Sequence, residues 1–401
     1  MKAGRANGRR AGGLLRPLAG ILALSVAGAA FAVPYRPADA SLVLERVPAR
    51  SALERLAPLR AAVTARPDAL EPALGLARGY IEIGRRESDP RFIAYAESTL
   101  APWLRMREPP EPALVLQAIA LQYLHQFDAS LALLERAQIA QPLDGQAWLT
   151  RAGLLELRGE FEDARRACAR LVRTTDEITS LTCLMSVESR SGHLAGSYAA
   201  INRLPATDAR LPAEIRSWLL SVRADMAERL GDDRGAEDDL KAALAIAPED
   251  PYLRATYADL LIRLDRPNEV LALLQGQEAA DPLLLRLAIA GRRAGAPDAR
   301  RFADLYAERI RAAQRDNDVT HRREQAMFLL EVAGDAAGAL SAAAANWKAQ
   351  REPVDIRLYA RAAERTRSTP DRAVIAAWLG ASHYEDHVLG AQSGTATGAG
   401  P

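Results

Sequence analysis

Cysteine is nearly absent from this chain of 401 residues, which contains only Cys168 and Cys183. The two form no Cys-x-x-Cys pair, which excludes a zinc site of that type and a thioredoxin-type redox motif. Histidine is also scarce, and none of the five lies in a nucleophile elbow, a phosphate-binding loop or a zinc-hydrolase motif. The sequence therefore predicts no catalytic centre, no metal site and no cofactor.

Aromatic residues are also few, at 5% of the chain, although hydrophobic residues make up 49%. Alanine and leucine dominate the apolar residues, whereas the strands of a β-sandwich need β-branched and aromatic residues. This composition favours helices that pack closely through small side chains.

A basic stripe is missing as well. The formal net charge is +1, but the first 32 residues hold five basic residues and no acid, so the remainder stands at −4. A mildly acidic surface with evenly mixed charges does not suit the phosphate backbone of nucleic acids. We therefore expect no nucleic-acid partner.

A repeat with a period of 34 residues is the strongest positive signal. Ala118 and Ala152 are separated by this interval, and so are Phe127 and Phe161. A unit of this length cannot bury its own apolar face, so neighbouring units must stack into a solenoid with a long concave surface.

The clearest unit covers residues 145–178, and units 111–144 and 217–250 match it nearly as well. Its apolar residues recur at helical spacing around a turn glycine: Trp148, Ala152, Leu155, Gly159, Phe161, Ala164, Cys168 and Leu171. This pattern resembles the tetratricopeptide repeat. The resemblance implies an all-α fold, a right-handed α-α superhelix of helix-turn-helix repeats over residues 66–382, and a binding scaffold that is not an enzyme.

The N-terminus has the pattern of an export signal. Basic residues precede an apolar stretch, Leu18 to Phe31, which closes with Ala30-Phe31-Ala32. We expect a signal peptide over residues 1–32, cleavage near Ala32, and an exported, periplasmic protein with no membrane contact after cleavage. The alternative is an uncleaved anchor. A proline-rich arm over residues 33–65 and a disordered glycine-rich tail over residues 383–401 flank the array.

The repeat register places Cys168 and Cys183 on adjacent helices. An exported protein meets an oxidising compartment, where such a pair can form a disulfide. Two buried free thiols are the alternative, and the sequence leaves both open.

Ligands of tetratricopeptide arrays are usually held by exposed residues of the first helix of each repeat. Carried over by register, the resemblance places these residues on the concave face: Tyr123, Glu156, Arg190, Trp218, Asp225, Arg229, Tyr252, Asp259 and Arg263. Aromatic residues flanked by arginine and acids are typical of a groove that binds a protein or peptide.

These features predict a protein-interaction scaffold that assists assembly of an envelope or secretion complex. Two alternatives come from other segments. The cluster His383-Tyr384-Glu385-Asp386-His387 has two histidines at i and i+4, which suits a metal-handling or enzyme accessory protein if a helix carries them. An uncleaved N-terminal stretch would make the chain a membrane-tethered structural subunit.

Overall fold

The computed structural model describes residues 51–315 and 321–392. The chain divides into two units, 1–49 and 50–401, and every helix belongs to the second. The predicted signal peptide, its cleavage site, part of the arm and residues 393–401 of the tail lie outside the described residues. Within the described ranges, no helix has both the length and the apolar character needed to cross a membrane.

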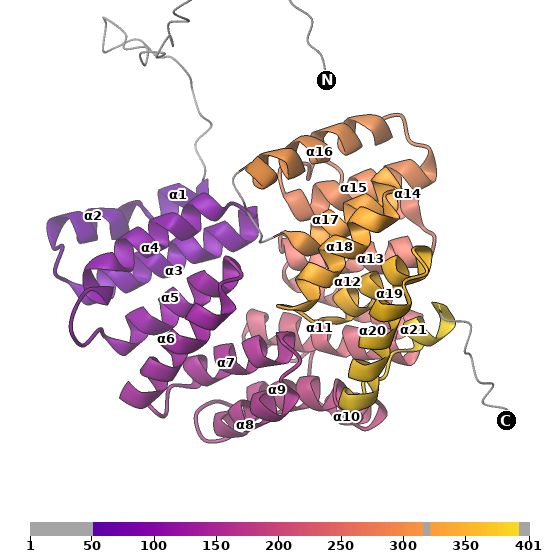
Figure 1. The fold of residues 1–401 in the computed structure, drawn as a ribbon. Helices are drawn as coiled ribbons and strands as arrows, with labels where there is room; N and C mark the ends of the chain where they lie inside the picture. The colour runs from indigo at the N-terminus through magenta and orange to yellow at the C-terminus, as the bar shows by residue number, and fades with distance from the viewer. Residues whose placement is uncertain (1–50, 316–320, 393–401) are drawn as a thin grey trace, which may run out of the picture. The chain divides into compact units, whose positions relative to one another are not determined.

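The predicted all-α fold class is confirmed, because every regular element in the described residues is helical (Figure 1). Consecutive helices pack against each other in pairs, as expected for a solenoid of helix-turn-helix repeats. The first helices are α3 (Leu70–Glu87), α5 (Glu111–Tyr123), α7 (Gly145–Leu157), α9 (Glu177–Ser189), α11 (Ala213–Leu230), α13 (Pro251–Arg263), α15 (Asp281–Ala294), α17 (Arg322–Phe328), which continues as the π-helical η1 (Leu329–Ala333), and α19 (Pro353–Arg365). The second helices are α4 (Pro90–Leu104), α6 (Phe127–Ala140), α8 (Phe161–Leu171), α10 (Leu194–Ile201), α12 (Asp233–Ile246), α14 (Pro267–Leu273), α16 (Ala299–Arg315), α18 (Ala336–Trp347) and α20 (Thr369–Ser382).

Each pair turns through one residue in the left-handed region of backbone conformation. These residues are Ser88, His125, Gly159, Gly192, Gly231, Asp265, Gly295, Gly334 and Arg367. Most are glycine, which reaches this conformation without a steric penalty. The non-glycine members at positions 125 and 265 hold the same place in the repeat as Gly159 and Gly231, so the turn geometry is kept where the consensus residue is lost.

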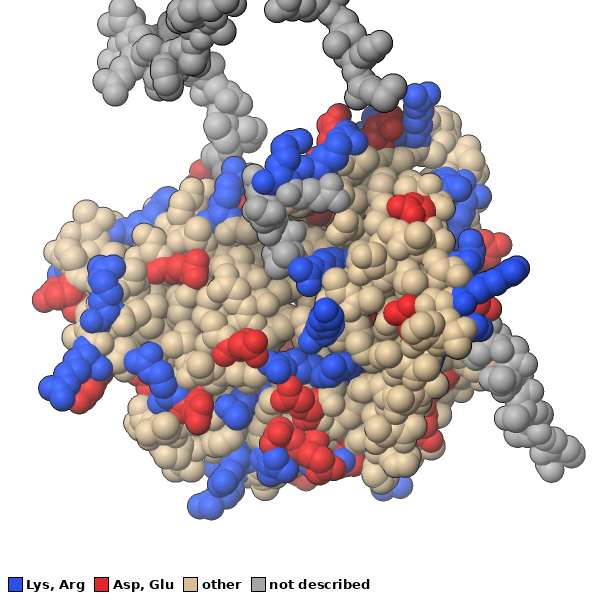
Figure 2. All heavy atoms as spheres, in the orientation of Figure 1, with Lys and Arg blue, Asp and Glu red and all other residues tan. Residues whose placement is uncertain are grey.

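The paired helices approach closely because small residues lie between them. Ala118, Ala152 and Ala258 are all fully buried. At the entry to the first helices, Asp144 and Asp176 accept hydrogen bonds from backbone N–H groups in the first turn, which stabilises the helix start. Acidic and basic side chains are interspersed over the face of the molecule in Figure 2, with no broad field of one sign.

The helical region begins before the predicted start of the array at residue 66. Two short helices, α1 (Ser51–Arg55) and α2 (Ala57–Ala65), precede α3, and α2 packs against it. Leu56 is buried against Gly79 of α3, where no side chain could be added without a collision. The second half of the predicted arm is therefore part of the packed structure.

The helical region also extends beyond the predicted end at residue 382. Tyr384 and Val388 are buried, and α21 (His387–Gln392) lies in what the composition predicts to be a disordered tail. The correction has a physical reason: Tyr384 packs against Trp378, and α21 contacts both α11 and α19.

Cys168 of α8 and Cys183 of α9 are joined by a disulfide, and both side chains are buried. The bond closes a loop with a sequence separation of 15 residues. A constraint of this length stabilises the folded state by about 3 kcal/mol in the chain-entropy model.

The C-terminal pairs fold back onto the middle of the array. The backbone N–H of Arg351 donates to the carbonyl of Leu157 over 2.8 Å, and Gln350 lies 2.7 Å from the His125 ring nitrogen Nδ1. Further along, the backbone N–H of Leu194 donates to Glu385 over 2.9 Å. The C-terminal chain thus meets the region of successive turns from α5/α6 to α9/α10.

Candidate functional site

A cavity of about 2350 Å³ lies on the concave side of the array. The first helix of every pair from α3 to α19 contributes side chains to its wall, which agrees with the register used to predict the binding face. The cavity is therefore the candidate binding site.

All of the predicted concave-face residues except Arg229 line this cavity: Tyr123, Glu156, Arg190, Trp218, Asp225, Tyr252, Asp259 and Arg263. The structure brings them into one continuous wall. Their role in binding stays a prediction.

Arg229 is the exception, because its side chain is buried. It donates to the carbonyl and the hydroxyl of Ser189 over 2.7 and 2.6 Å, and it pairs with Asp225 at 3.0 Å. Arg229 faces away from the cavity and cannot contact a ligand there. The register gives the correct helix, but this position lies at the end of α11, where the side chain turns back toward α9.

The middle of the wall carries a chain of paired charges. Arg190 lies 3.1 Å from Glu156 and 3.9 Å from Asp225, and the Ser186 hydroxyl donates to Glu156 over 2.6 Å. Burial raises the pKa of Glu156, against the opposing effect of Arg190. Burial also acts to raise the pKa of Asp225, but the positive charges of Arg229, Arg190 and Arg357 outweigh it and hold that pKa below its usual value.

A second set of charges continues along α13 and α15. The carboxylate of Asp259 accepts two hydrogen bonds from Arg286, over 2.9 and 2.6 Å. Arg263 donates to Glu228 over 2.7 Å, and Glu228 also accepts from Arg357 over 2.7 Å. These arginines are rigidly placed because each is fixed by a carboxylate.

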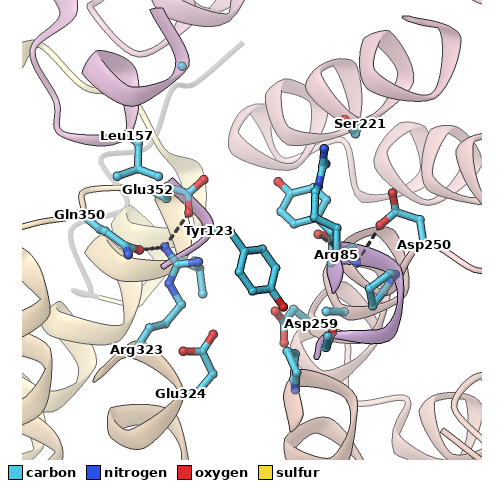
Figure 3. A pocket seen from close by; sticks show the side chains of 18 of the residues that line it. Arg85, Tyr123, Leu157, Ser221, Asp250, Asp259, Arg323, Glu324, Gln350 and Glu352 are labelled. Atoms are coloured by element: carbon cyan, nitrogen blue, oxygen red, sulfur yellow. Dashed lines mark hydrogen bonds and ion pairs between the residues drawn. The ribbon is translucent and has the colours of Figure 1, made fainter. Parts of the chain in front are cut away.

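The C-terminal side of the cavity has its own cluster around Arg323. This side chain donates to Asp355 over 2.6 Å and to Gln350 over 2.7 Å, and it pairs with Glu352 (Figure 3). Asn346 donates to the same Asp355 over 2.7 Å. In Figure 3, the ring of Tyr123 projects between this cluster and Asp259 on the opposite side.

The wall formed by α3 and α5 is mostly apolar. Ile81, Val115, Leu116 and Ile119 line the cavity there, next to Tyr123. The hydroxyl of Tyr123 donates to the carbonyl of Gly84 over 3.2 Å, and burial raises the pKa of this tyrosine to about 12. The cavity therefore has an apolar wall on α3 and α5 and a charged wall from α7 to α19.

Sequence reasoning missed several charged residues of the wall. Arg286 follows Trp218 and Tyr252 at the same interval of 34 residues, so continuing the register would have found it. Arg323, Glu352 and Arg357 belong to degenerate repeats in which that interval is lost, and no sequence signal marks them.

The histidine-containing segment at residues 383–387 is a packing element in this structure. His383 has a left-handed backbone with φ of 54° and ends α20, so no helix carries His383 and His387 on one face. Asp386 pairs with Arg357, and Glu385 accepts from Leu194. Among residues 51–315 and 321–392, no group of three or more histidine, cysteine, aspartate or glutamate side chains is arranged to hold a metal ion.

Neither a family model nor a curated protein sequence matches the chain. Among solved structures it is similar to human IFIT1 in a dimer with PPP-AAAA, with 12% identity, a TM-score of 0.46, and coverage of 79% of this chain and 78% of that one. It is also similar to the APC/C hetero-tetramer Cut9–Hcn1 (13%, 0.39, 78% and 52%) and to the TPR domain of P58(IPK) (14%, 0.25, 73% and 99%). The chain thus spans about half the length of the Cut9–Hcn1 chain that it matches. At these identities the likeness concerns the helical repeat fold and no function.

Proposed function

We propose that this protein is a non-enzymatic scaffold that holds a segment of a partner protein in the concave cavity. The observation that carries the proposal is the pair of unlike walls, apolar on α3 and α5 and charged from α7 to α19. A partner segment that is apolar on one side and polar on the other matches both walls, as in helix-in-groove recognition.

The size of the cavity favours a polypeptide over a small molecule. Sites for small ligands have volumes of about 300–1,000 Å³, whereas this cavity has about 2350 Å³. The fixed arginines also suit binding, because ordering them was completed on folding and costs no further side-chain entropy when a partner arrives.

The cellular role follows from the N-terminal sequence. We propose that the chain is exported to the periplasm, that cleavage occurs near Ala32, and that the scaffold assists assembly of an envelope or secretion complex. The mass of the mature protein tests the cleavage: a chain that begins at Val33 supports it, and an intact N-terminus favours the membrane-tethered alternative.

Tyr252 gives the most direct test of the cavity. Its side chain lines the cavity and is 61% exposed, so it can be changed with little effect on folding. We expect a photo-reactive benzoylphenylalanine at position 252 to cross-link a partner in cells, and Tyr252→Ala to weaken binding of that partner by at least about tenfold, because buried tyrosines are frequent hot spots.

Tyr95 provides the matched control, since it is 52% exposed and is not part of the cavity wall. The same photo-reactive residue at position 95 should give no cross-link to that partner, and Tyr95→Ala should bind normally. Equal cross-linking from the two positions, or none from position 252, contradicts the proposal.

A further inference from the structure

The short segment Tyr384-Glu385-Asp386, here called the strap, occupies a defined place on the array. Tyr384 is 7% exposed. Its ring centroid lies 5.6 Å from that of Trp378 in α20, and the guanidinium carbon of Arg229 in α11 lies 5.4 Å from it. The tyrosine is therefore held between an aromatic ring and a buried cation, the geometry of a cation–π contact.

The two acids of the strap each meet their own donors. Glu385 accepts from the backbone N–H of Leu194, the first residue of α10, over 2.9 Å. Asp386 accepts from the Nε and Nη2 atoms of Arg357 over 2.8 and 3.1 Å, a two-pronged contact that recognises a carboxylate specifically. One aromatic side chain and two carboxylates are thus read separately.

The residues that receive the strap are fixed by other partners. Arg229 is anchored to Ser189 and Asp225, as described above, and Arg357 also donates to Glu228. Trp378 has further ring contacts, with a centroid distance of 6.1 Å to Phe161. The strap seat, defined as Leu194, Arg229, Arg357 and Trp378, is therefore pre-organised without the strap, which favours binding.

We propose that the strap seat is a peptide-recognition site for a segment with an aromatic residue followed by two acidic residues, which the strap fills within its own chain. A partner protein that carries such a segment competes with the strap for the seat. This inference does not depend on what occupies the concave cavity, so the two proposals can fail separately.

The test uses the full chain and a fluorescein-labelled peptide with the sequence of residues 381–388. The double variant Tyr384→Ala/Asp386→Ala removes the main anchors of the strap and leaves the seat intact. We expect this variant to bind the peptide at least about tenfold more tightly than the wild-type chain, where the tethered strap competes at an effective concentration of about 1 mM. Fluorescence anisotropy measures both affinities.

Two further peptides test the chemistry of recognition. A peptide that keeps only Tyr-Glu-Asp between glycine and serine residues should bind the double variant within about threefold of the full sequence, and replacing its tyrosine with alanine should weaken binding by at least about tenfold. Adding Arg357→Gln to the double variant should cause a comparable loss.

Equal binding to the wild-type chain and the double variant overturns the proposal, and so does failure of the Tyr-Glu-Asp peptide to bind. Circular dichroism and thermal melting establish that the double variant folds. If it does not, the milder Glu385→Gln variant serves as host, and the same order of affinities is expected.

Discussion

Glu111 is the carboxyl group whose ionisation costs the folded protein free energy. It begins α5 and lines the cavity, and within the described residues its Oε1 atom is buried with no hydrogen-bond partner. Burial and the negative charge of Asp144 raise its pKa from 4.5 to about 7. Between these two pH values the folded state holds a proton that the unfolded state has lost, so this group makes the protein less stable as pH rises.

Replacing Glu111 with glutamine should remove this pH-dependent loss. Relative to the wild-type chain, we expect Glu111→Gln to gain about 1 kcal/mol of unfolding free energy between pH 5 and pH 8, less than the full shift implies because the side chain is partly exposed to screening solvent. Urea unfolding at both pH values measures it. Glu135→Gln, an exposed change on α6, should show no such difference, and an equal response of the two variants refutes the assignment.

At the scale of elements, the turns between paired helices serve two purposes. Gly192 reverses the chain between α9 and α10 with φ of 88°, and it also lies against the strap. A Cβ atom added there would lie 2.9 Å from the Cβ of His383, whereas one added at Gly295, with φ of 64°, would meet nothing within 4 Å. The first glycine is required for backbone conformation and for close approach, and the second only for backbone conformation.

This pair of glycines separates the two effects by mutation. Gly295→Ala should lower the unfolding free energy by about 1–2 kcal/mol, the cost of a left-handed non-glycine residue. Gly192→Ala should cost more and should increase hydrogen exchange at residues 384–388, because the collision displaces the strap. Guanidine unfolding and mass-spectrometric exchange provide the readouts. Unchanged exchange in the strap with Gly192→Ala would show that the contact is dispensable.

The sequence predicts these elements well because their signals are local. Ala118, Ala152 and Gly159 repeat at one interval, and that interval sets both the close packing and the turns. The candidate site was predicted only in its first half, since the register continues to Arg286 and is lost before Arg323. The strap could not be predicted, because the residues on either side of it are far apart in the chain and carry no shared period.

At the scale of the whole described region, Arg357 connects the two ends of the array. It donates to Glu228 of α11 and to Asp386 beside α21. The Asp386 side chain is fully buried, so a loss of the cation leaves an unpaired charge inside the protein. The closed arrangement of the array therefore depends on this one guanidinium.

Arg357→Ala should lower the unfolding free energy by about 3–5 kcal/mol, the usual cost of removing one partner of a buried ion pair. Hydrogen exchange should rise together in α11 and in α19 to α21. Arg372→Ala, an exposed change on α20, is the control and should leave both unaffected. A similar unfolding midpoint for the two variants would falsify the assigned role of Arg357.

The contacts that close the array also bear on how the chain folds. In an open repeat array each unit touches only its neighbours, so folding starts anywhere and the ends unravel first. Here, hydrogen bonds join residues that are 191, 193 and 225 positions apart: Leu194 with Glu385, Arg158 with Arg351, and His125 with Gln350. Such distant contacts form late because long loops must close first, which slows folding. Once formed, they link early and late repeats into one cooperative transition, and the C-terminal repeats lose the independent fraying of an open solenoid.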